Sequence, residues 1–528
     1  PWYVDGATFV FESDNPGIAS VDQNGLVTAL SKGTAFITIT ANGTTLPPKY
    51  VKVVVGDIYR INNYTLYDYY GGEICEIPRD KNVMYLDEDC FKNNTTVKKV
   101  ILPSTLTEIP ENAFQGCINL EYVEINGQCN VVGRDAFKNL PKLTTVKFGK
   151  FVDRENNPHD EFNGTITIGP GAFEGCTALA TIENSKRITT TKDRSFAGCT
   201  ALTSVDLSEL TVVGKEDFAG CTSLSDVTTS EFTKIGKGMF EGCTALTSFT
   251  YGGQNIGSGA FANCTNLTSV TLTSSDFRGI GANAFENTAI DNFTLPDGTY
   301  TIGDYAFKDC TALTIVNLSD GTRPTFGRSV FIGATSFAGS ATSGFYIKGY
   351  SSERNHNYSV SSGVLYSLDG YELISVPAYT NDFLMSVLVD KIADGALSGV
   401  QLSNELDMTR IKQIGKYAFA DSSVTKVTFE NLTTIPAGLF AGCSKLTEVV
   451  GLDNVTSVGD RAFIGCTSLT SVSLPNVTTV GNSAFALCEK LTVLSAENLA
   501  EAGDSAFSGA NIANVNFPRL SVIGEEAF

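Results

Sequence analysis

The amino-acid sequence predicts a β-rich repeat solenoid, in which short units stack on one another, and three observations support this prediction. A phrase of the form Gly-x-x-x-Phe-x-x-Cys recurs along the chain, for example at 236–243 and 459–466. Its aromatic residues lie 21 to 24 positions apart, as Phe240, Phe261 and Phe285 illustrate. Stretches that alternate apolar and polar residues, typical of half-buried strands, separate the phrases. A fixed period of this length indicates stacked units that cannot bury their apolar faces alone.

Residues 1–56 differ from the repeats and predict a small β-sandwich. Short alternating stretches are separated there by Asn-Pro, Asn-Gly and Lys-Gly turns. The residues from Ser13 to Thr38 resemble bacterial Ig-like domains of group 2. The resemblance implies that the sandwich is truncated, with its opening strands before Pro1, and that it serves as a spacer in a cell-surface protein.

Residues 57–90 predict a tyrosine-rich junction that leads into the N-terminal edge of the solenoid. This segment contains six of the 19 tyrosines, although it is a small part of the chain. They are Tyr59, Tyr64, Tyr67, Tyr69, Tyr70 and Tyr85.

One repeat, 201–218, illustrates how each unit is expected to fold. Its alternation around Val205 predicts a short strand with inward-facing apolar residues, and a second extended stretch follows at 210–213. The recurrent glycine, here Gly214, indicates either a positive φ angle or a close backbone approach. The next residues are expected to form a helical turn that places Phe218 and Cys221 beneath the strand. Stacking at about 4.8 Å per repeat would then align the aromatic rings in a continuous spine.

The aromatic register runs from Phe91 to Phe528, and two gaps interrupt its spacing. The first gap, 36 residues from Phe137 to Phe173, predicts one repeat that carries a surface loop at 149–164. The second gap, 66 residues from Phe331 to Leu397, equals three repeats of 22, so degenerate repeats and an irregular excursion both fit 332–396. The sequence therefore predicts two repeat arrays, at 91–331 and 397–528. The register comprises Phe91, Phe114, Phe137, Phe173, Phe196, Phe218, Phe240, Phe261, Phe285, Phe307, Phe331, Leu397, Phe419, Phe440, Phe463, Phe485, Phe507 and Phe528.

Ten of the 13 cysteines lie three residues after the aromatic position, where Leu140, Thr288 or Ala510 stands in other repeats. Replacement by such residues indicates a site for a small or apolar side chain, which free cysteine also provides. We therefore expect a buried ladder of free thiols rather than a disulfide framework. The pairing of Cys75, Cys90 and Cys129, which lie outside the ladder, stays open. The ladder comprises Cys117, Cys176, Cys199, Cys221, Cys243, Cys264, Cys310, Cys443, Cys466 and Cys488.

The repeated phrase resembles the leucine-rich repeat of the Treponema pallidum type, which is found in BspA-like bacterial surface proteins. The resemblance covers 91–528 and implies a right-handed arc whose strands line the concave side. The outward strand positions are then candidate binding residues, and they predict a face rich in Thr, Ser and Asn without aromatic platforms. These candidates are Asp206, Thr228, Thr250, Thr271, Thr294 and Asn317.

A second candidate binding region is the tyrosine-rich segment 332–396, represented by Tyr346, Tyr350 and Tyr358. Tyrosine suits recognition surfaces because its ring is apolar and its hydroxyl is polar. The alternative is that these tyrosines pack an irregular hairpin, since Gly363 and Gly370 punctuate the segment as hairpin turns do.

Catalytic chemistry is not expected. Only His159 and His356 are present, which removes most histidine-dependent nucleophilic and zinc sites from consideration, and no phosphate-binding or nucleophile motif occurs. Loop 149–164 carries Asp153, Glu155 and Asp160, but their spacing matches no defined calcium loop, so a solvated loop is favoured over a cation site. We therefore predict no enzyme activity, no cofactor and no metal.

Charge and hydropathy restrict the partners and the location of the protein. Lys and Arg number 37 against 57 Asp and Glu, which gives a net charge of −20 and disfavours nucleic acids and anionic membrane surfaces. No apolar stretch is long enough to span a bilayer. No signal segment opens the chain and Phe528 ends it within a repeat phrase, so we expect an excerpt of a longer extracellular or surface-attached product.

These features predict a non-enzymatic scaffold of the cell surface or a secreted scaffold that mediates adhesion or protein–protein interaction. The resemblance implies a protein ligand, either a host matrix protein or another bacterial surface protein. Two alternatives stay open at this stage: a glycan-binding accessory protein and a structural element of a surface layer.

Overall fold

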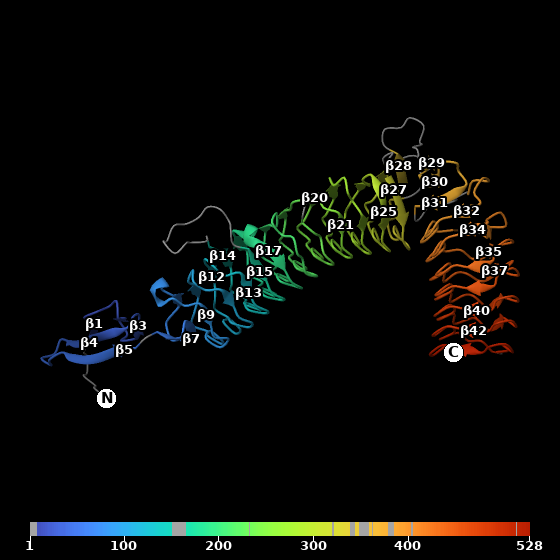
Figure 1. The fold of residues 1–528 in the computed structure, drawn as a ribbon. Helices are drawn as coiled ribbons and strands as arrows, with labels where there is room; N and C mark the ends of the chain where they lie inside the picture. Colours follow the sequence, from blue (N-terminus) through green and yellow to red (C-terminus); the bar gives the residue numbers. More distant parts are fainter. Residues whose placement is uncertain are drawn as a thin grey trace. The chain divides into compact units, whose positions relative to one another are not determined.

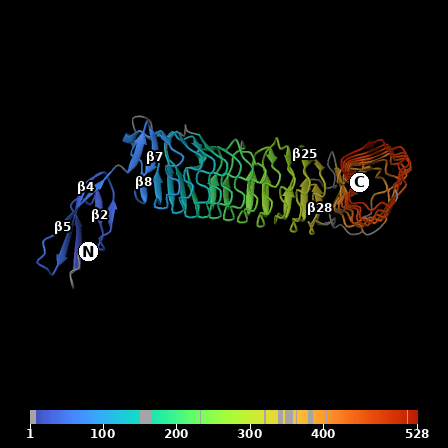
Figure 2. The same ribbon diagram turned by 90° about the horizontal axis from the view of Figure 1, so that it is seen from below.

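The computed structural model describes residues 8–56, 58–149, 165–231, 233–318, 322–337, 344–347, 358–361, 363–377, 385–402, 405–513 and 515–528. The chain forms two compact units, unit 1 (Pro1–Thr228) and unit 2 (Thr229–Phe528). In both units the strands of successive repeats lie side by side, so each is a β-solenoid over most of its length (Figure 1). Figure 2 shows the last repeats of unit 2, in orange and red, nearly end-on with their coils superimposed.

Unit 1 begins with two small antiparallel sheets, as predicted for the N-terminal sandwich. Their strands are β1 (Thr8–Ser13), β2 (Ala19–Val21), β3 (Val27–Ala29), β4 (Gly33–Asn42) and β5 (Lys49–Val55). One sheet has the order β1-β4-β5 and the other pairs β2 with β3. Ala19, Ala35 and Val55 form the buried cluster between them.

The junction closes the N-terminal end of the aromatic spine in unit 1. It contains β6 (Tyr59–Asn62), β7 (Thr65–Tyr69), β9 (Tyr85–Leu86) and the 3-10 turn η1 (Arg79–Lys81). The Tyr69 ring centroid lies 5.8 Å from that of Phe91 and 5.7 Å from that of Tyr59. Part of the tyrosine cluster therefore covers the first repeat.

Most repeats contribute one strand to a first sheet and one to a second sheet, and the pairing between repeats is parallel; at Val212 and Ile235 the second sheet is reduced to isolated bridges. In unit 1 the strands on the side of the first sheet are β8 (Ile74–Glu76), β10 (Lys99–Ile101), β12 (Tyr122–Ile125), β14 (Thr145–Phe148) and β16 (Thr181–Glu183), which are hydrogen-bonded in this order, followed by the separate pair β18 (Ser204–Asp206) and β19 (Asp226–Thr228). The second sheet contains β11 (Glu108–Ile109), β13 (Val131–Val132), β15 (Ile166–Ile168) and β17 (Ile188–Thr191), and the 3-10 turn η2 (Ser185–Arg187) precedes β17.

Unit 2 repeats the same arrangement. Its first-sheet strands are β20 (Ser248–Tyr251), β22 (Ser269–Leu272), β24 (Asn292–Thr294), β26 (Ile315–Leu318), β28 (Gly344–Ile347), β33 (Leu406–Asp407), β35 (Lys426–Thr428), β37 (Glu448–Val450), β39 (Ser471–Ser473) and β41 (Val493–Ser495). Its second-sheet strands are β21 (Asn255–Ile256), β23 (Gly279–Ile280), β25 (Gly298–Ile302), β27 (Thr322–Phe326), β32 (Lys391–Ile392), β34 (Gln413–Ile414), β36 (Thr434–Ile435), β38 (Ser457–Val458), β40 (Thr479–Val480), β42 (Glu501–Ala502) and β43 (Val522–Ile523).

The aromatic spine is confirmed within each unit. The rings of Phe114 and Phe137 stack with centroids 4.6 Å apart, and those of Phe261 and Phe285 with centroids 5.6 Å apart. Phe137 also stacks on Phe173 at 5.0 Å, which confirms that the first gap is one repeat carrying an insertion. Of the predicted loop 149–164, all residues after Gly149 lie outside the described residues.

The helical turns expected after each glycine are replaced by tight turns, and the described residues contain no helix other than η1 and η2. The Cys221 amide donates to the Phe218 carbonyl at 3.1 Å, which closes a short turn. The Phe196 amide donates at 2.8 Å to the carbonyl of Asp217 in the next repeat. Because such amides pair between repeats, they are not available for the i to i−4 bonds of an α-helix.

The recurrent glycine is required by close approach rather than by a positive φ angle. A Cβ on Gly214 would lie 2.2 Å from the carbonyl carbon of Lys192, and one on Gly281 would lie 2.4 Å from the amide nitrogen of Ser258. No side chain fits between repeats at these points. The structure thus decides between the two explanations that the sequence left open.

The predicted thiol ladder is confirmed: all thirteen cysteines, each of them within the described residues, are buried, and none of them forms a disulfide. The ladder also has a hydrogen-bonding role. The Cys221 thiol lies 3.3 Å from the carbonyl oxygen of Phe196, one repeat earlier, and the Cys117 thiol lies 2.9 Å from that of Phe91. The thiol therefore adds a weak donor for a buried carbonyl, which leucine or alanine at this position cannot provide.

Among its described residues, the second gap continues the first sheet with β28, which pairs in parallel with β26, and then forms an irregular excursion before β32. It contains an antiparallel hairpin of β30 (Val364–Ser367) and β31 (Glu372–Ser375), with β29 (Tyr358–Ser361) paired to β30. This confirms the hairpin that Gly363 and Gly370 predict. β31 then pairs in parallel with β32, the first second-sheet strand of the following array.

A polar clamp joins the two arrays of unit 2 across this excursion. The Arg328 guanidinium donates to both carboxylate oxygens of Asp421, at 3.1 Å and 2.9 Å. Its carbon lies 5.5 Å and 5.8 Å from the ring centroids of Tyr305 and Tyr417. The Ser329 hydroxyl donates to Asp421 at 2.6 Å. These side chains bridge the arrays where the regular backbone ladder between repeats is interrupted.

Candidate binding face

The first sheet of each unit presents an outward surface, which we call the strand face, formed by alternate residues of its strands. On β20, for example, Phe249 and Tyr251 are buried while Ser248 and Thr250 are exposed. Parallel pairing aligns equivalent residues, so Thr250 is the direct partner of Thr271 on the neighbouring β22. The alternation of the sequence therefore produces straight rows of exposed side chains across the repeats.

All six predicted residues lie on the strand face, as three registered pairs. Asp206 faces Thr228 in unit 1. In unit 2, Thr250 faces Thr271, and Thr294 faces Asn317. Thr228, Thr250, Thr271 and Thr294 are exposed, whereas Asp206 and Asn317 are half-buried.

From β20 to β26, the strand face of unit 2 is neutral and rich in hydrogen-bonding groups, whereas β35 and β37 carry the ion pair of Lys426 with Glu448 at 2.9 Å. The Asn317 amide donates to Asn292 Oδ1 at 2.5 Å and to Thr294 Oγ1 at 3.3 Å, which fixes this end of the row. The hydroxyls of Thr250 and Thr271 are exposed on the neighbouring strands. Such a surface can form many directional contacts without the desolvation cost of buried charges.

The strand face in unit 1 is more charged. Lys147 forms an ion pair with Glu124 at 3.1 Å, and Lys186 lies 3.5 Å from Asp206. Asp206 is therefore already engaged within the chain, which distinguishes it from the threonines of unit 2. An ion pair at such a half-exposed site contributes little to stability, about 0 to 1 kcal/mol.

The prediction of a face without aromatic platforms is wrong at Tyr122 on β12. Its ring lies 4.9 Å from the Lys99 ammonium, and its hydroxyl donates to Glu124 at 2.9 Å. Burial, followed by the neighbouring carboxylates, raises the pKa of Tyr122 to about 12. The predicted positions miss Tyr122 because they include only one of the two outward residues on each strand.

The same omission affects every strand of the face. On each strand, a second outward residue lies two positions before the predicted one. The period-two alternation of the sequence indicates this second row as well. In the strands that carry the predicted residues, this row consists of Ser204, Asp226, Ser248, Ser269, Asn292 and Ile315.

The second candidate region is described only in part. Tyr350 lies outside the described residues, while Tyr346 and Tyr358 belong to β28 and β29 by their backbones. Of the neighbouring tyrosines, Tyr366 is buried in the hairpin and Tyr371 is 49% exposed. Burial raises the pKa of Tyr366.

The described residues contain neither a metal-binding cluster nor a helix of membrane-spanning length. They contain no group of three or more His, Cys, Asp or Glu side chains arranged to hold a metal ion. The two histidines and the acidic residues of loop 150–164 lie outside the described ranges. In the part of the chain that the structure covers, no helix is long and apolar enough to cross a membrane.

Comparison with protein families gives two matches. The model described as the BspA type leucine rich repeat region matches 56–157, 160–255, 233–341 and 412–528. The model of the bacterial Ig-like domain, group 2, matches 4–49. Among curated proteins, none is similar enough in sequence to be matched.

Several solved structures are similar to this chain in fold. A leucine rich cell surface protein from Faecalibacterium prausnitzii is 20% identical, with 83% of this chain and 92% of that chain covered and a TM-score of 0.38. A leucine-rich repeat protein from Bacteroides ovatus is also 20% identical, with 90% and 91% covered and a TM-score of 0.39. The leucine rich repeat protein of T. pallidum is 18% identical, with 53% and 86% covered and a TM-score of 0.20.

Proposed function

Because this chain belongs to the family of proteins with the BspA type leucine rich repeat region, we propose that it is a non-enzymatic scaffold whose strand face binds another protein. The observation that supports this proposal is the registered row of exposed hydroxyls on the strand face of unit 2. The strands there form the concave side of a right-handed arc in this proposal. Binding residues are Thr250, Thr271, Thr294 and Asn317 in unit 2, with Asp206 and Thr228 as the equivalent pair in unit 1.

Rigidity gives this face its capacity to bind. Each strand is held by the buried residues beneath it, such as Phe249 and Val270, and by parallel bonds to its neighbours. The side chains at the surface are short, so little conformational entropy is lost when a partner orders them. Many modest contacts over a preformed surface then add up to useful affinity.

We propose a location outside the cell, either secreted or on the bacterial surface, and adhesion as the physiological role. A host matrix protein or another bacterial surface protein is the partner class in this proposal. The net charge of −20 disfavours nucleic acids because like charges repel.

The test compares two sets of three substitutions. One variant replaces Thr250, Thr271 and Thr294 with arginine on the strand face. Its matched control carries arginine at three exposed threonines of unit 2 that follow the Cys or Ala of the repeat phrase, Thr265, Thr311 and Thr335. Immobilised wild-type protein is first used to capture partners from extracellular-matrix proteins and bacterial surface extracts.

The strand-face variant should lose that capture while the control variant keeps it, with both melting transitions close to that of the wild type. Equal capture by the two variants would exclude the strand face as the binding surface. Failure of the wild type to capture any protein from either source would count against the proposal as a whole.

Glycan binding is the alternative function, and Tyr122 is the observation that favours it. An aromatic ring on an outward strand position, next to Lys99 and Glu124, offers an apolar surface with hydrogen-bonding groups beside it. A sugar-array screen of the wild type and a Tyr122→Ala variant separates the two functions, since only a glycan-binding face would give a signal that this substitution removes.

A further inference from the structure

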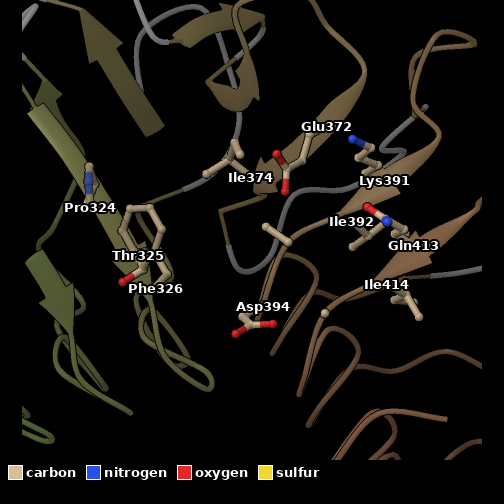
Figure 3. Close-up of a pocket in the computed structure, with 12 residues that line it drawn as sticks. Pro324, Thr325, Phe326, Glu372, Ile374, Lys391, Ile392, Asp394, Gln413 and Ile414 are labelled. Atoms are coloured by element: carbon tan, nitrogen blue, oxygen red, sulfur yellow. The ribbon is translucent and has the colours of Figure 1, made fainter. Parts of the chain in front are cut away.

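Unit 2 contains a cleft of about 480 Å³ on the side of the second sheet, at the excursion that separates its two arrays. β27 forms one wall, and β31, β32 and β34 provide the other (Figure 3). In Figure 3, Thr325 and Phe326 lie on one side, and Ile374, Ile392 and Ile414 lie on the other. This volume is in the range of about 300 to 1,000 Å³ that small-ligand sites occupy.

The cleft exists because β31 takes the place of a regular neighbour. Where a glycine follows a second-sheet strand, its amide commonly donates to the strand of the preceding repeat, as Gly327 does to Ile302 at 2.8 Å. Ala393 instead donates to Leu373 on β31, at 2.9 Å. β32 therefore pairs with the excursion, and the outer edge of β27 faces the cleft.

Contacts at the turns keep the cleft preformed. A Cβ on Gly395 would lie 2.4 Å from the Gly327 carbonyl oxygen, so the turns of the two arrays remain in close contact beside the cleft. The Ser329 and Ser398 hydroxyls lie 2.7 Å apart, and the Arg328–Asp421 clamp lies in the same region. A site that is already open in the folded chain avoids an ordering cost on binding.

The lining of the cleft is apolar inside and charged at its rim. Five apolar side chains form the walls: Pro324, Phe326, Ile374, Ile392 and Ile414. The charged lining residues are Glu372, Asp394 and Lys391, so carboxylates outnumber ammonium groups. Glu372 is the direct partner of Lys391 across β31 and β32, and the two lie at one side of the cleft (Figure 3).

This lining disfavours an added β-strand as the occupant. The Gly327 amide points toward β25. Because successive backbone amides of a strand point to opposite sides, the amide position of residue 324 points toward the cleft. Residue 324 is proline, which has no amide hydrogen to donate. The centre of the β27 edge therefore offers no amide donor to an extended peptide that would pair with it.

We propose that the cleft binds an apolar side chain that adjoins a basic residue in a partner polypeptide. The apolar side chain packs among Ile374, Ile392 and Phe326, and the basic residue lies near Glu372 and Asp394 at the rim. This proposal rests on the proposed protein-binding function, and it adds an anchoring site away from the strand face. Anchors of this kind, which fill a pocket while the surrounding contacts exclude water, carry much of the affinity of protein interfaces.

The test uses the full chain labelled with ¹³C at the δ1 methyl groups of isoleucine. The probes are two dipeptides with acetylated and amidated ends, Lys-Phe and Glu-Phe. The methyl signals of Ile374, Ile392 and Ile414, assigned by Ile→Val substitution, should shift in a saturable way with Lys-Phe. Affinity for Glu-Phe should be about tenfold weaker or undetectable. Absence of shifts at these methyls with Lys-Phe, or equal affinity for both dipeptides, would overturn the proposal.

A variant tests the role of the rim charge. Glu372→Gln keeps the shape of the side chain and should weaken Lys-Phe binding about three- to tenfold, whereas the control Glu489→Gln, at an exposed site outside the cleft, should leave it unchanged. Equal affinities of the two variants would remove Glu372 from the site. Because the probes are small and defined, failure here leaves the strand-face capture experiment unaffected, and the two proposals fail separately.

Discussion

Asp217 is a buried carboxylate at a position where other repeats place alanine, and its replacement should stabilise the protein at alkaline pH. Ala113, Ala136 and Ala172 occupy the equivalent position before the spine phenylalanine, and all are fully buried. Asp217 is 0% exposed, and its Oδ1 has no hydrogen-bond partner among the described residues. Its Oδ2 accepts from the Thr191 hydroxyl at 2.5 Å and from the Gly214 amide at 2.9 Å.

Burial raises the pKa of Asp217 from 3.8 to about 7, and the hydrogen bonds from Thr191 and Gly214 offset only part of this increase. Between these two values the unfolded chain has already lost the proton that the folded chain keeps. The free energy of unfolding therefore decreases as the pH rises through this window. Above both values, the decrease is about 4 kcal/mol, from the pKa difference of about 3 and about 1.4 kcal/mol per pH unit.

An Asp217→Ala substitution removes this penalty and also removes two hydrogen bonds, worth about 1 kcal/mol each. We expect the variant to exceed the wild type in stability by about 2 kcal/mol at pH 8 and to lie within about 1 kcal/mol of it at pH 5. Urea denaturation at the two pH values measures the difference in the free energy of unfolding between the variant and the wild type. The control is Glu209→Ala, which removes an exposed carboxylate. If the difference between Asp217→Ala and the wild type is the same at both pH values, Asp217 does not titrate in this range and the argument is refuted.

Three further predictions concern the clamp, the spine and the thiols. Arg328→Met should cost about 3 kcal/mol in urea denaturation because it leaves the Asp421 carboxylate unpaired, and Arg328→Met combined with Asp421→Leu should recover most of that loss. Phe285→Ala should cost about 3 to 5 kcal/mol by the same measurement, since it opens a cavity among stacked rings, and a loss below about 1 kcal/mol would contradict the spine. Burial raises the pKa of the Cys221 thiol to about 12. A thiol reagent at pH 8 should therefore label the thirteen buried cysteines only after denaturation. Rapid labelling of the native protein would show that the ladder is accessible.

Local sequence patterns predicted the strand face well because the side-chain period of a strand is two. The outward position of Thr250 follows from the buried Phe249 beside it, and the same holds on β18, β22 and β24. The chemistry of the face was less predictable. The contact of Lys99 with Tyr122 joins residues of different repeats and depends on which strands are neighbours, which a single repeat does not reveal.

The sequence by itself determined the repeat: its period, the ring spine, the buried thiols and the alternation of the strands. Each of these features involves only a repeat and its immediate neighbours, so a fixed spacing records it completely. The tertiary structure alone decided what happens where the period breaks. Arg328 meets Asp421 across 93 residues, and β31 pairs with β32 in the segment for which the sequence left degenerate repeats and an excursion both open. Such contacts depend on where a long excursion returns to the stacked repeats, and no local sequence pattern encodes that position. The clamp and the cleft beside it are consequences of where the excursion returns.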